Sequence, residues 1–161
     1  MTEVPPARFR GVSHIAIGVT DVDRALGFYR DLLGLRVVRR SDDQPAVVTT
    51  ESASDEAPSR GQVVHLAWSD GPFEPFLTLT RHAPVLGDRG LPLNHVGANH
   101  VGFWVDGFRD IADRLTAAGV PVVMAPLLSD SDQYPGGTGT VISMMVTDPD
   151  GTVIQIEQRD P

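Results

Sequence analysis

The chain has 161 residues, of which 41% are hydrophobic, so it can form one compact domain or two small units with a shared core. Its net charge of −8 disfavours a nucleic-acid partner and an anionic membrane surface. Because the chain contains no cysteine, any bound metal must have nitrogen and oxygen ligands. The N-terminal segment lacks an apolar stretch of signal-peptide length and no later segment has the length of a membrane span, so we expect a cytoplasmic protein without a membrane partner.

The first half of the chain predicts a strand, a helix and three further strands. Residues 12–19, VSHIAIGV, alternate between two faces, which is typical of a strand. Residues 20–35 predict a helix with Asp21 as its N-cap and Gly34 as its C-cap. The acidic segment 41–60, rich in Ser and Pro, predicts an excursion or a mobile loop. Strands are expected before and after it, at 35–39, 62–69 and 74–81.

The second half repeats this order after a linker rich in Pro and Gly, residues 82–97. NHVGFWVD alternates, GFRDIADRLTAAG is helical, and strands are expected in VPVVMA, TVISMMVT and TVIQIEQ. A constant offset pairs Gly34 with Gly119, and one residue of slip before the helix pairs His14 with His100. At the far end FLTLT pairs with VIQIE. We therefore infer an internal duplication, with modules 9–81 and 98–159 in a single domain that spans residues 1–161.

Strand alternation gathers four polar side chains on one face. Helices must cover one face of each sheet, so the more apolar residues of every strand should point toward them. The other face then carries His14, His100, Gln155 and Glu157. His95 has the wrong spacing and is expected in a loop or at a strand entry. If the polar face is curved it forms a cavity, where two neutral imidazoles and one oxygen ligand could bind a divalent metal.

Other polar and aromatic residues carry weaker signals. His65 and His82 are isolated, and we expect structural or surface positions for them. Trp104 shares the spacing of His100, so it either lines the cavity or packs against the other module. Tyr134, in the segment YPGGTG, is a candidate ligand contact in a flexible lid. That segment precedes a strand rather than a helix N-terminus, so we expect no nucleotide cofactor.

Three segments, HIAIGVTDVDRALGFYRDLLGL, NHVGFWVDGFRDIADRLTAAGV and DPDGTVIQIEQ, together resemble the vicinal oxygen chelate superfamily. Glyoxalase I, extradiol dioxygenases, fosfomycin-resistance enzymes and bleomycin-binding proteins share its fold. The resemblance implies an α+β fold of two βαβββ modules that form a curved mixed sheet around a shared cavity, with the helices on the outer face. It also implies metal ligands at the first and last strands of each module, at His14, Thr78, His100 and Gln155.

Two of these positions depart from the pattern of the family. Thr78 stands where glyoxalase I-like members have a glutamate, and because threonine is a poor ligand we expect it, with Thr80, to contact the substrate. Gln155 stands where most metal-using relatives also have a glutamate. Either the amide oxygen of Gln155 binds the metal, or Glu157 reaches the site, or the oxygen ligand is absent. Glu157 is also the candidate catalytic carboxylate.

The sequence therefore favours a small-molecule enzyme that depends on a divalent metal (Fe, Mn, Ni, Zn or Co). Lyase, isomerase and ring-cleaving dioxygenase reactions on a substrate with vicinal oxygens all remain open. The alternative is a metal-free binding protein that sequesters an antibiotic or a metabolite, as in bleomycin resistance. The resemblance further implies a homodimer, in which the modules pair either within one chain or by exchange between two chains.

Overall fold

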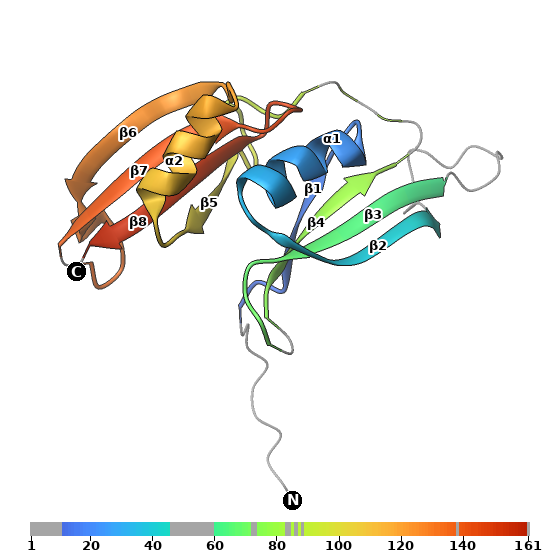
Figure 1. Ribbon diagram of the computed structural model, residues 1–161, viewed down its shortest axis with the longest axis horizontal. Coiled ribbons are helices and arrows are strands. Elements are labelled where there is room, and N and C mark those ends of the chain that lie inside the picture. The colour runs from blue at the N-terminus through green and yellow to red at the C-terminus, as the bar shows by residue number, and fades with distance from the viewer. Residues whose placement is uncertain are drawn as a thin grey trace, which may run out of the picture.

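Two four-stranded sheets, each with a helix across it, make up the structure (Figure 1). The computed structural model describes residues 11–45, 60–71, 74–82, 85, 87, 89–137 and 139–160. The first half contains, in chain order, β1 (His14–Gly18), α1 (Val22–Leu26), the π-helical turn η1 (Gly27–Leu32), β2 (Arg36–Pro45), β3 (Arg60–Ala67) and β4 (Phe76–Arg81). The second half contains β5 (His100–Trp104), α2 (Phe108–Ala117), β6 (Val122–Asp130), the 3-10 turn η2 (Ser131–Gln133), β7 (Thr140–Thr147) and β8 (Val153–Asp160).

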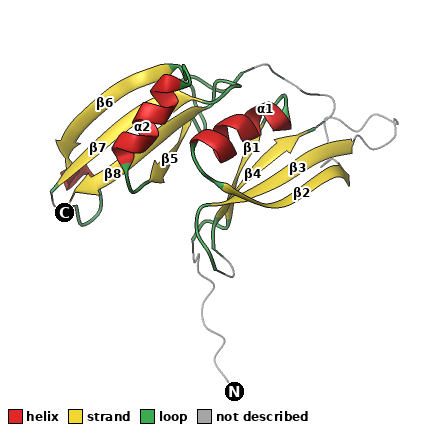
Figure 2. Cartoon of the chain, in the orientation of Figure 1, coloured by secondary structure: helices red, strands yellow, loops and turns green. Residues whose placement is uncertain are grey.

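The two sheets share one topology. Their strand orders are β1-β4-β3-β2 and β5-β8-β7-β6. In each sheet the first and last strands of the module are parallel, and the other neighbours are antiparallel. Figure 2 shows both helices in front of the strands, on the same side of the pair of sheets. This repeated order confirms the predicted α+β fold of two βαβββ modules. The module boundaries at residues 82–97 stay a prediction.

The first helix begins and ends where its capping residues predict. The Asp21 side chain accepts a hydrogen bond from the backbone amide of Arg24 at 2.9 Å, and Gly34 adopts a left-handed φ of 82°. Its second half is π-helical rather than α-helical, because the Leu33 amide donates to the carbonyl of Phe28. The adjacent aromatic residues Phe28 and Tyr29 are both buried in this turn.

Strand β2 is longer than predicted. It was expected at 35–39 but runs from Arg36 to Pro45, into the segment that we predicted as a loop. Pairing with β3 accounts for the difference, since Gln44 and Pro45 oppose Gly61 and Arg60 after a register shift. Tertiary pairing thus overrides the loop-like composition of this segment. The rest of the predicted loop, residues 46–59, lies outside the described residues.

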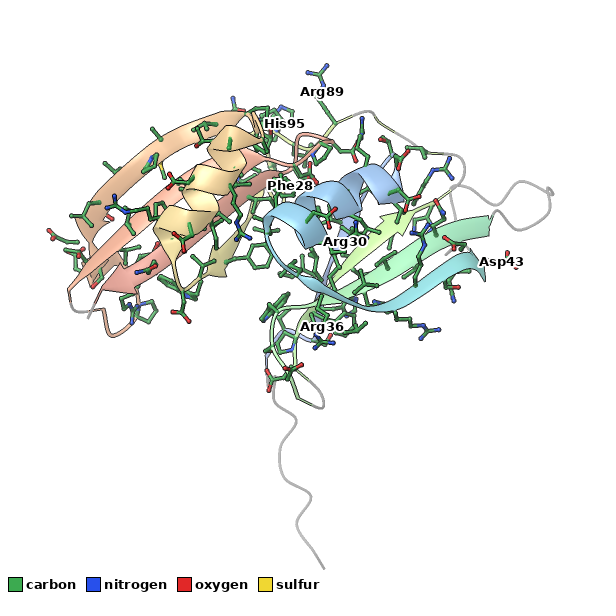
Figure 3. All side chains as sticks on the ribbon, in the orientation of Figure 1. Phe28, Arg30, Arg36, Asp43, Arg89 and His95 are labelled. Atoms are coloured by element: carbon green, nitrogen blue, oxygen red, sulfur yellow. The ribbon has the colours of Figure 1, made fainter. Side chains whose placement is uncertain are left out.

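One hydrophobic core includes residues from both modules. Leu26 and Phe28 of the first module belong to the same buried cluster as Ile111 and Leu115 of α2. Figure 3 shows Phe28 between the two halves of the molecule. The modules therefore meet through their helices. Among the described residues, no helix is long and apolar enough to cross a bilayer.

Polar contacts reinforce this junction at the turn that follows β7. The Tyr29 hydroxyl donates to the Asp148 carboxylate at 2.8 Å, and both side chains are buried. Asp150, two residues further on, accepts from the Thr20 hydroxyl at 2.6 Å and from the Arg24 guanidinium at 2.5 Å. Burial raises the pKa of Asp148, and burial followed by the Asp148 charge raises the pKa of Tyr29. Each carboxylate therefore depends on donors from the first module.

Replacing Tyr29 with Phe is expected to lower the free energy of unfolding by about 1.5–3 kcal/mol, because a buried carboxylate loses a donor. Chemical unfolding of both proteins at neutral pH measures the difference. Thr116→Val is the matched control, since it also removes one hydroxyl, from an exposed helix position, and should change stability by less than about 0.5 kcal/mol. Equal stability of Tyr29→Phe and the unmodified protein would contradict the prediction.

Candidate active site

Each sheet has one face covered by a helix and an opposite face, which we name the helix-free face. In β4, Leu77 and Leu79 belong to the core, so Thr78 between them lies on the helix-free face. The β1–β4 register sets His14 beside Phe76, and these two residues share the side of Thr78. Thr80, further along β4, lies on this side too, and its hydroxyl is 3.4 Å from the Ile17 carbonyl.

In the second sheet, Ile154 and Ile156 of β8 belong to the core, and Gln155 and Glu157 lie on the helix-free face. His100 lies across from Val153 at the start of β5, on the same side as both polar residues. His95 lies in a turn before β5, where its amide donates to the Pro92 carbonyl at 3.0 Å, and Figure 3 labels it there.

Aromatic and hydrogen-bond contacts join the residues of the first helix-free face. The His14 and Phe76 rings stack with centroids 5.4 Å apart, and the His65 ring meets the Phe76 ring edge-on at 4.9 Å. His65 Nδ1 and Thr78 Oγ1 are 3.0 Å apart, which is hydrogen-bond distance. Burial lowers the pKa of His65, and the charge on Arg39 adds to the effect. His65 is therefore neutral at pH 7.

His65 was expected to be structural or on the surface, and its face was not predicted. It lies on the same face as His14, where its Nδ1 is within hydrogen-bond distance of Thr78 Oγ1. The signal was present in the alternation of β3, because Val64 and Leu66 are both apolar and His65 lies between them. What alternation could not supply is the register that sets His65 opposite Thr78.

A buried carboxylate dominates the second helix-free face. Only 7% of Glu157 is exposed. Its Oε1 accepts hydrogen bonds from the Tyr134 hydroxyl and, at 2.6 Å, from Gln155 Nε2. Its Oε2 lies over Gly102, where an added Cβ would be 3.6 Å from that oxygen. In the part of the chain that the structure describes, no basic side chain forms an ion pair with Glu157, and its two hydrogen-bond donors, Tyr134 and Gln155, are neutral.

Aromatic residues border this carboxylate. The Tyr134 and Trp104 rings meet at a centroid distance of 5.2 Å, and the Arg159 guanidinium lies 5.3 Å from the Trp104 ring. Burial, with the hydrogen bond to Glu157, raises the pKa of Tyr134 to about 12. Tyr134 is therefore protonated at neutral pH and donates a hydrogen bond to Glu157.

The imidazole of His100 is oriented by Asn99. Asn99 Nδ2 donates to the Leu93 carbonyl at 2.9 Å, so its other polar atom, Oδ1, is the one that faces His100 Nδ1 at 2.7 Å. A carbonyl oxygen only accepts, and His100 Nδ1 must therefore carry the proton. Nε2 keeps its lone pair, which is the form that a metal-binding imidazole requires. His14 has a weaker counterpart, with Ser13 Oγ at 3.1 Å from its Nδ1.

The predicted ligands lie on both sheets of the chain. Across the described ranges, no three His, Asp or Glu side chains lie where they could hold a metal ion. His14 belongs to β1 and His100 to β5, which are edge strands of different sheets. Two grooves on the helix side, of about 440 and 580 Å³, contain none of the predicted site residues. The predicted site residues are thus distributed over the helix-free faces of both sheets.

Comparison with known families identifies the fold. The model of the Glyoxalase/Bleomycin resistance protein/Dioxygenase superfamily matches residues 11–156. The chain belongs to this superfamily. Its duplicated βαβββ architecture is the one that the resemblance implied.

Known relatives are distant. The chain is 23% identical over 151 residues to a virulence protein of Salmonella typhimurium, covering 91% of this chain and 83% of that protein. It is 26% identical over 147 residues to a probable lactoylglutathione lyase of Synechocystis, covering 90% and 92%. A glyoxalase family protein from Bacillus cereus has the same fold, with a TM-score of 0.72, 17% identity, and coverage of 99% of this chain and 100% of that one.

Removing the Asn99 side chain is expected to change the tautomer of His100. In the unmodified protein His100 should carry its proton on Nδ1, whereas in Asn99→Ala the Nε2-protonated form should become the major one, because the acceptor facing Nδ1 is lost. Nitrogen-15 chemical shifts of the imidazole distinguish the two forms. Asn94→Ala, an exposed position in the same loop, should leave the His100 tautomer unchanged.

Proposed function

We propose that this protein is a small-molecule enzyme dependent on a divalent metal, of the glyoxalase and dioxygenase type. Its substrate carries vicinal oxygens, and the reaction is a lyase, isomerase or ring-cleaving dioxygenase reaction. One observation carries the proposal: a buried carboxylate, Glu157, has no ion-pair partner among the described residues, accepts hydrogen bonds from neutral donors and lies on the same sheet face as His100. Such a carboxylate is stabilised by a cation or used as a base.

Three side chains would hold the ion: His14, His100 and Gln155. The donor set fits, because Asn99 keeps Nε2 of His100 unprotonated. Gln155 gives its amide nitrogen to Glu157, which leaves its amide oxygen as the available ligand atom. When bound, a divalent ion would chelate the vicinal oxygens of the substrate and act as a Lewis acid.

Glu157 serves two purposes in this arrangement. Through Oε1 it fixes the orientation of the Gln155 amide. Its negative charge also balances part of the charge of the ion, which the three neutral ligands do not. Its Oε2 receives no hydrogen bond from the described residues, so this atom is the one that takes a proton from the substrate. The rings of Tyr134 and Trp104 lie beside Glu157, and the Tyr134 hydroxyl donates a hydrogen bond to its carboxylate.

A homodimer completes the site in this proposal. His14 and His100 lie on the edge strands β1 and β5, and each edge strand has a neighbour on only one side in the sheet order. In a twofold dimer, β1 of one chain can approach β5 of the other, so that each site takes His14 from one subunit and His100 with Gln155 from the second. Exchange between chains and pairing of the modules within one chain both remain compatible with this arrangement.

Metal content tests the proposal directly. Protein purified without chelator, and reconstituted in turn with Fe(II), Mn(II), Co(II), Ni(II) and Zn(II), should bind one of these ions stoichiometrically by elemental mass spectrometry. His14→Ala and His100→Ala should each lose it, because two ligands remain too few. The matched control His95→Ala should keep it, since His95 lies in a turn outside the predicted site. Folded protein that binds none of the five ions would favour the alternative, a metal-free binding protein.

Mixing inactive variants tests the exchanged dimer. When His14→Ala and His100→Ala subunits are unfolded together and refolded, half of the dimers should be mixed, and each mixed dimer holds one intact site. Metal binding should therefore recover to roughly a quarter of the value for the unmodified protein. No recovery, in a mixture that light scattering shows to be dimeric, would mean that both histidines of a site come from one chain.

A further inference from the structure

The structure points to a second binding element, on the first sheet: we propose that Arg39, His65 and Thr78 form a subsite for a carboxylate group of the ligand. The inference rests on the proposed function only in that both concern one small-molecule ligand. It requires neither a metal nor a second chain, because all three residues lie in the first module.

The three residues form a row across adjacent strands. The β2–β3 register pairs Arg39 with His65, and the β3–β4 register pairs His65 with Thr78. Directly opposed residues of antiparallel strands point to the same face, with Cβ atoms about 4.5–5.5 Å apart. Val64 and Leu66, on either side of His65, are fully buried in the core, so the row lies on the helix-free face.

Thr78 determines which nitrogen of His65 carries the proton. The Thr78 side chain is buried, and among the described residues its hydroxyl has His65 Nδ1 as its hydrogen-bond partner. The buried hydroxyl proton has an acceptor only if the hydroxyl donates to Nδ1, because a proton on Nδ1 would leave it unsatisfied. His65 is thus protonated at Nε2, on the side of the ring away from Thr78, and presents a hydrogen-bond donor.

Arg39 brings a positive charge that the described part of the chain leaves without an ion pair. Its neighbours in β2 differ in this respect, since Arg36 pairs with Asp70 at 2.5 Å and Arg40 pairs with Asp23 at 2.6 Å. Arg39 lacks an ion pair among the described residues although the chain has 21 acidic and only 13 basic residues. A guanidinium beside a neutral Nε2–H donor is suited to an anion.

Charge and shape favour a carboxylate over a phosphate. Arg39 gives the row a formal positive charge, and a carboxylate carries one negative charge. A planar carboxylate can accept two parallel hydrogen bonds from the guanidinium, or one from Arg39 and one from His65. Phe76, whose ring contacts the rings of both His14 and His65, offers an apolar surface to the carbon skeleton of the ligand.

The row also lies close to the candidate metal ligand His14. Both histidines touch the ring of Phe76. A ligand whose carboxylate binds Arg39 therefore extends toward β1. The inferred substrate class is a carboxylic acid whose vicinal oxygens lie further along the same molecule.

The test uses chelator-treated protein and a simple probe. Benzoate is titrated into the protein while the side-chain NMR signals of His65 are followed, with benzamide as the uncharged control and inorganic phosphate as the competing anion. Benzoate should shift the His65 signals and saturate, benzamide should cause no shift, and phosphate should bind more weakly than benzoate. Arg39→Gln should raise the Kd for benzoate at least about tenfold, because a charge-assisted contact is lost.

Two further variants separate recognition from structure. Thr78→Val keeps the shape but removes the hydroxyl, so it should weaken benzoate binding and shift the His65 imidazole toward the Nδ1-protonated form. Arg109→Gln is the matched control, since it removes an exposed arginine from α2 and should leave the Kd unchanged. Benzoate binding that survives Arg39→Gln unchanged, or folded protein that binds benzoate no better than benzamide, would overturn the inference.

Because the protein is metal-free, this result does not depend on the metal-binding test. If the protein binds metal stoichiometrically but does not bind benzoate, the carboxylate subsite is rejected and the proposed enzyme is not. Benzoate binding without metal uptake would reject the metal-dependent reaction and keep the subsite.

Discussion

The hydrogen bond from the Tyr29 hydroxyl to the Asp148 carboxylate fixes how the two modules sit together. It joins the first helix to the turn before β8, and the Arg24–Asp150 pair reinforces it from the same helix. Because the modules meet through their helices and a shared core, the opposite faces of both sheets stay free of that interface. The edge strands β1 and β5, which carry His14 and His100, are left without a second neighbour in the sheet order. The arrangement of the predicted site residues on the helix-free faces thus follows from contacts on the helix side, such as the one between Tyr29 and Asp148.

Local sequence signals predict most of this fold, and the predictions fail mainly where the structure depends on pairing between strands that are far apart in the sequence. The Asp21 cap and the left-handed Gly34 and Gly119 appear as the sequence indicates, since caps depend on neighbouring residues only. The extension of β2 to Pro45 was missed because it depends on hydrogen bonds with β3, beyond a long intervening segment. The π-helical turn was missed because no local pattern distinguishes it from the end of an α-helix.

For the site, alternation predicts which face a side chain takes, but not what it contacts there. It places Gln155 and Glu157 on one face of β8, yet their mutual hydrogen bond depends on side-chain rotamers. The hydrogen bond between Asn99 and His100 could not be predicted either, because it requires the backbone carbonyl of Leu93 to orient the Asn99 amide. Arg39 and His65 become neighbours only through the register of β2 with β3, which includes a shift that no sequence pattern indicates.

The duplicated modules differ in the neighbours of one matching pair of residues. Thr78 and Gln155 occupy matching places on β4 and β8, and each uses its side chain to hold a titratable neighbour, His65 in one module and Glu157 in the other. The first helix-free face therefore offers neutral and positive donors, and the second offers a buried negative acceptor. A ligand bound between two such faces has one favourable direction, with its anionic end toward the first module and its proton-losing end toward Glu157. A symmetric pair of modules, with a carboxylate at both positions, would lack this direction. The two departures from the family's pattern, Thr78 and Gln155, thus give the two faces different hydrogen-bond partners.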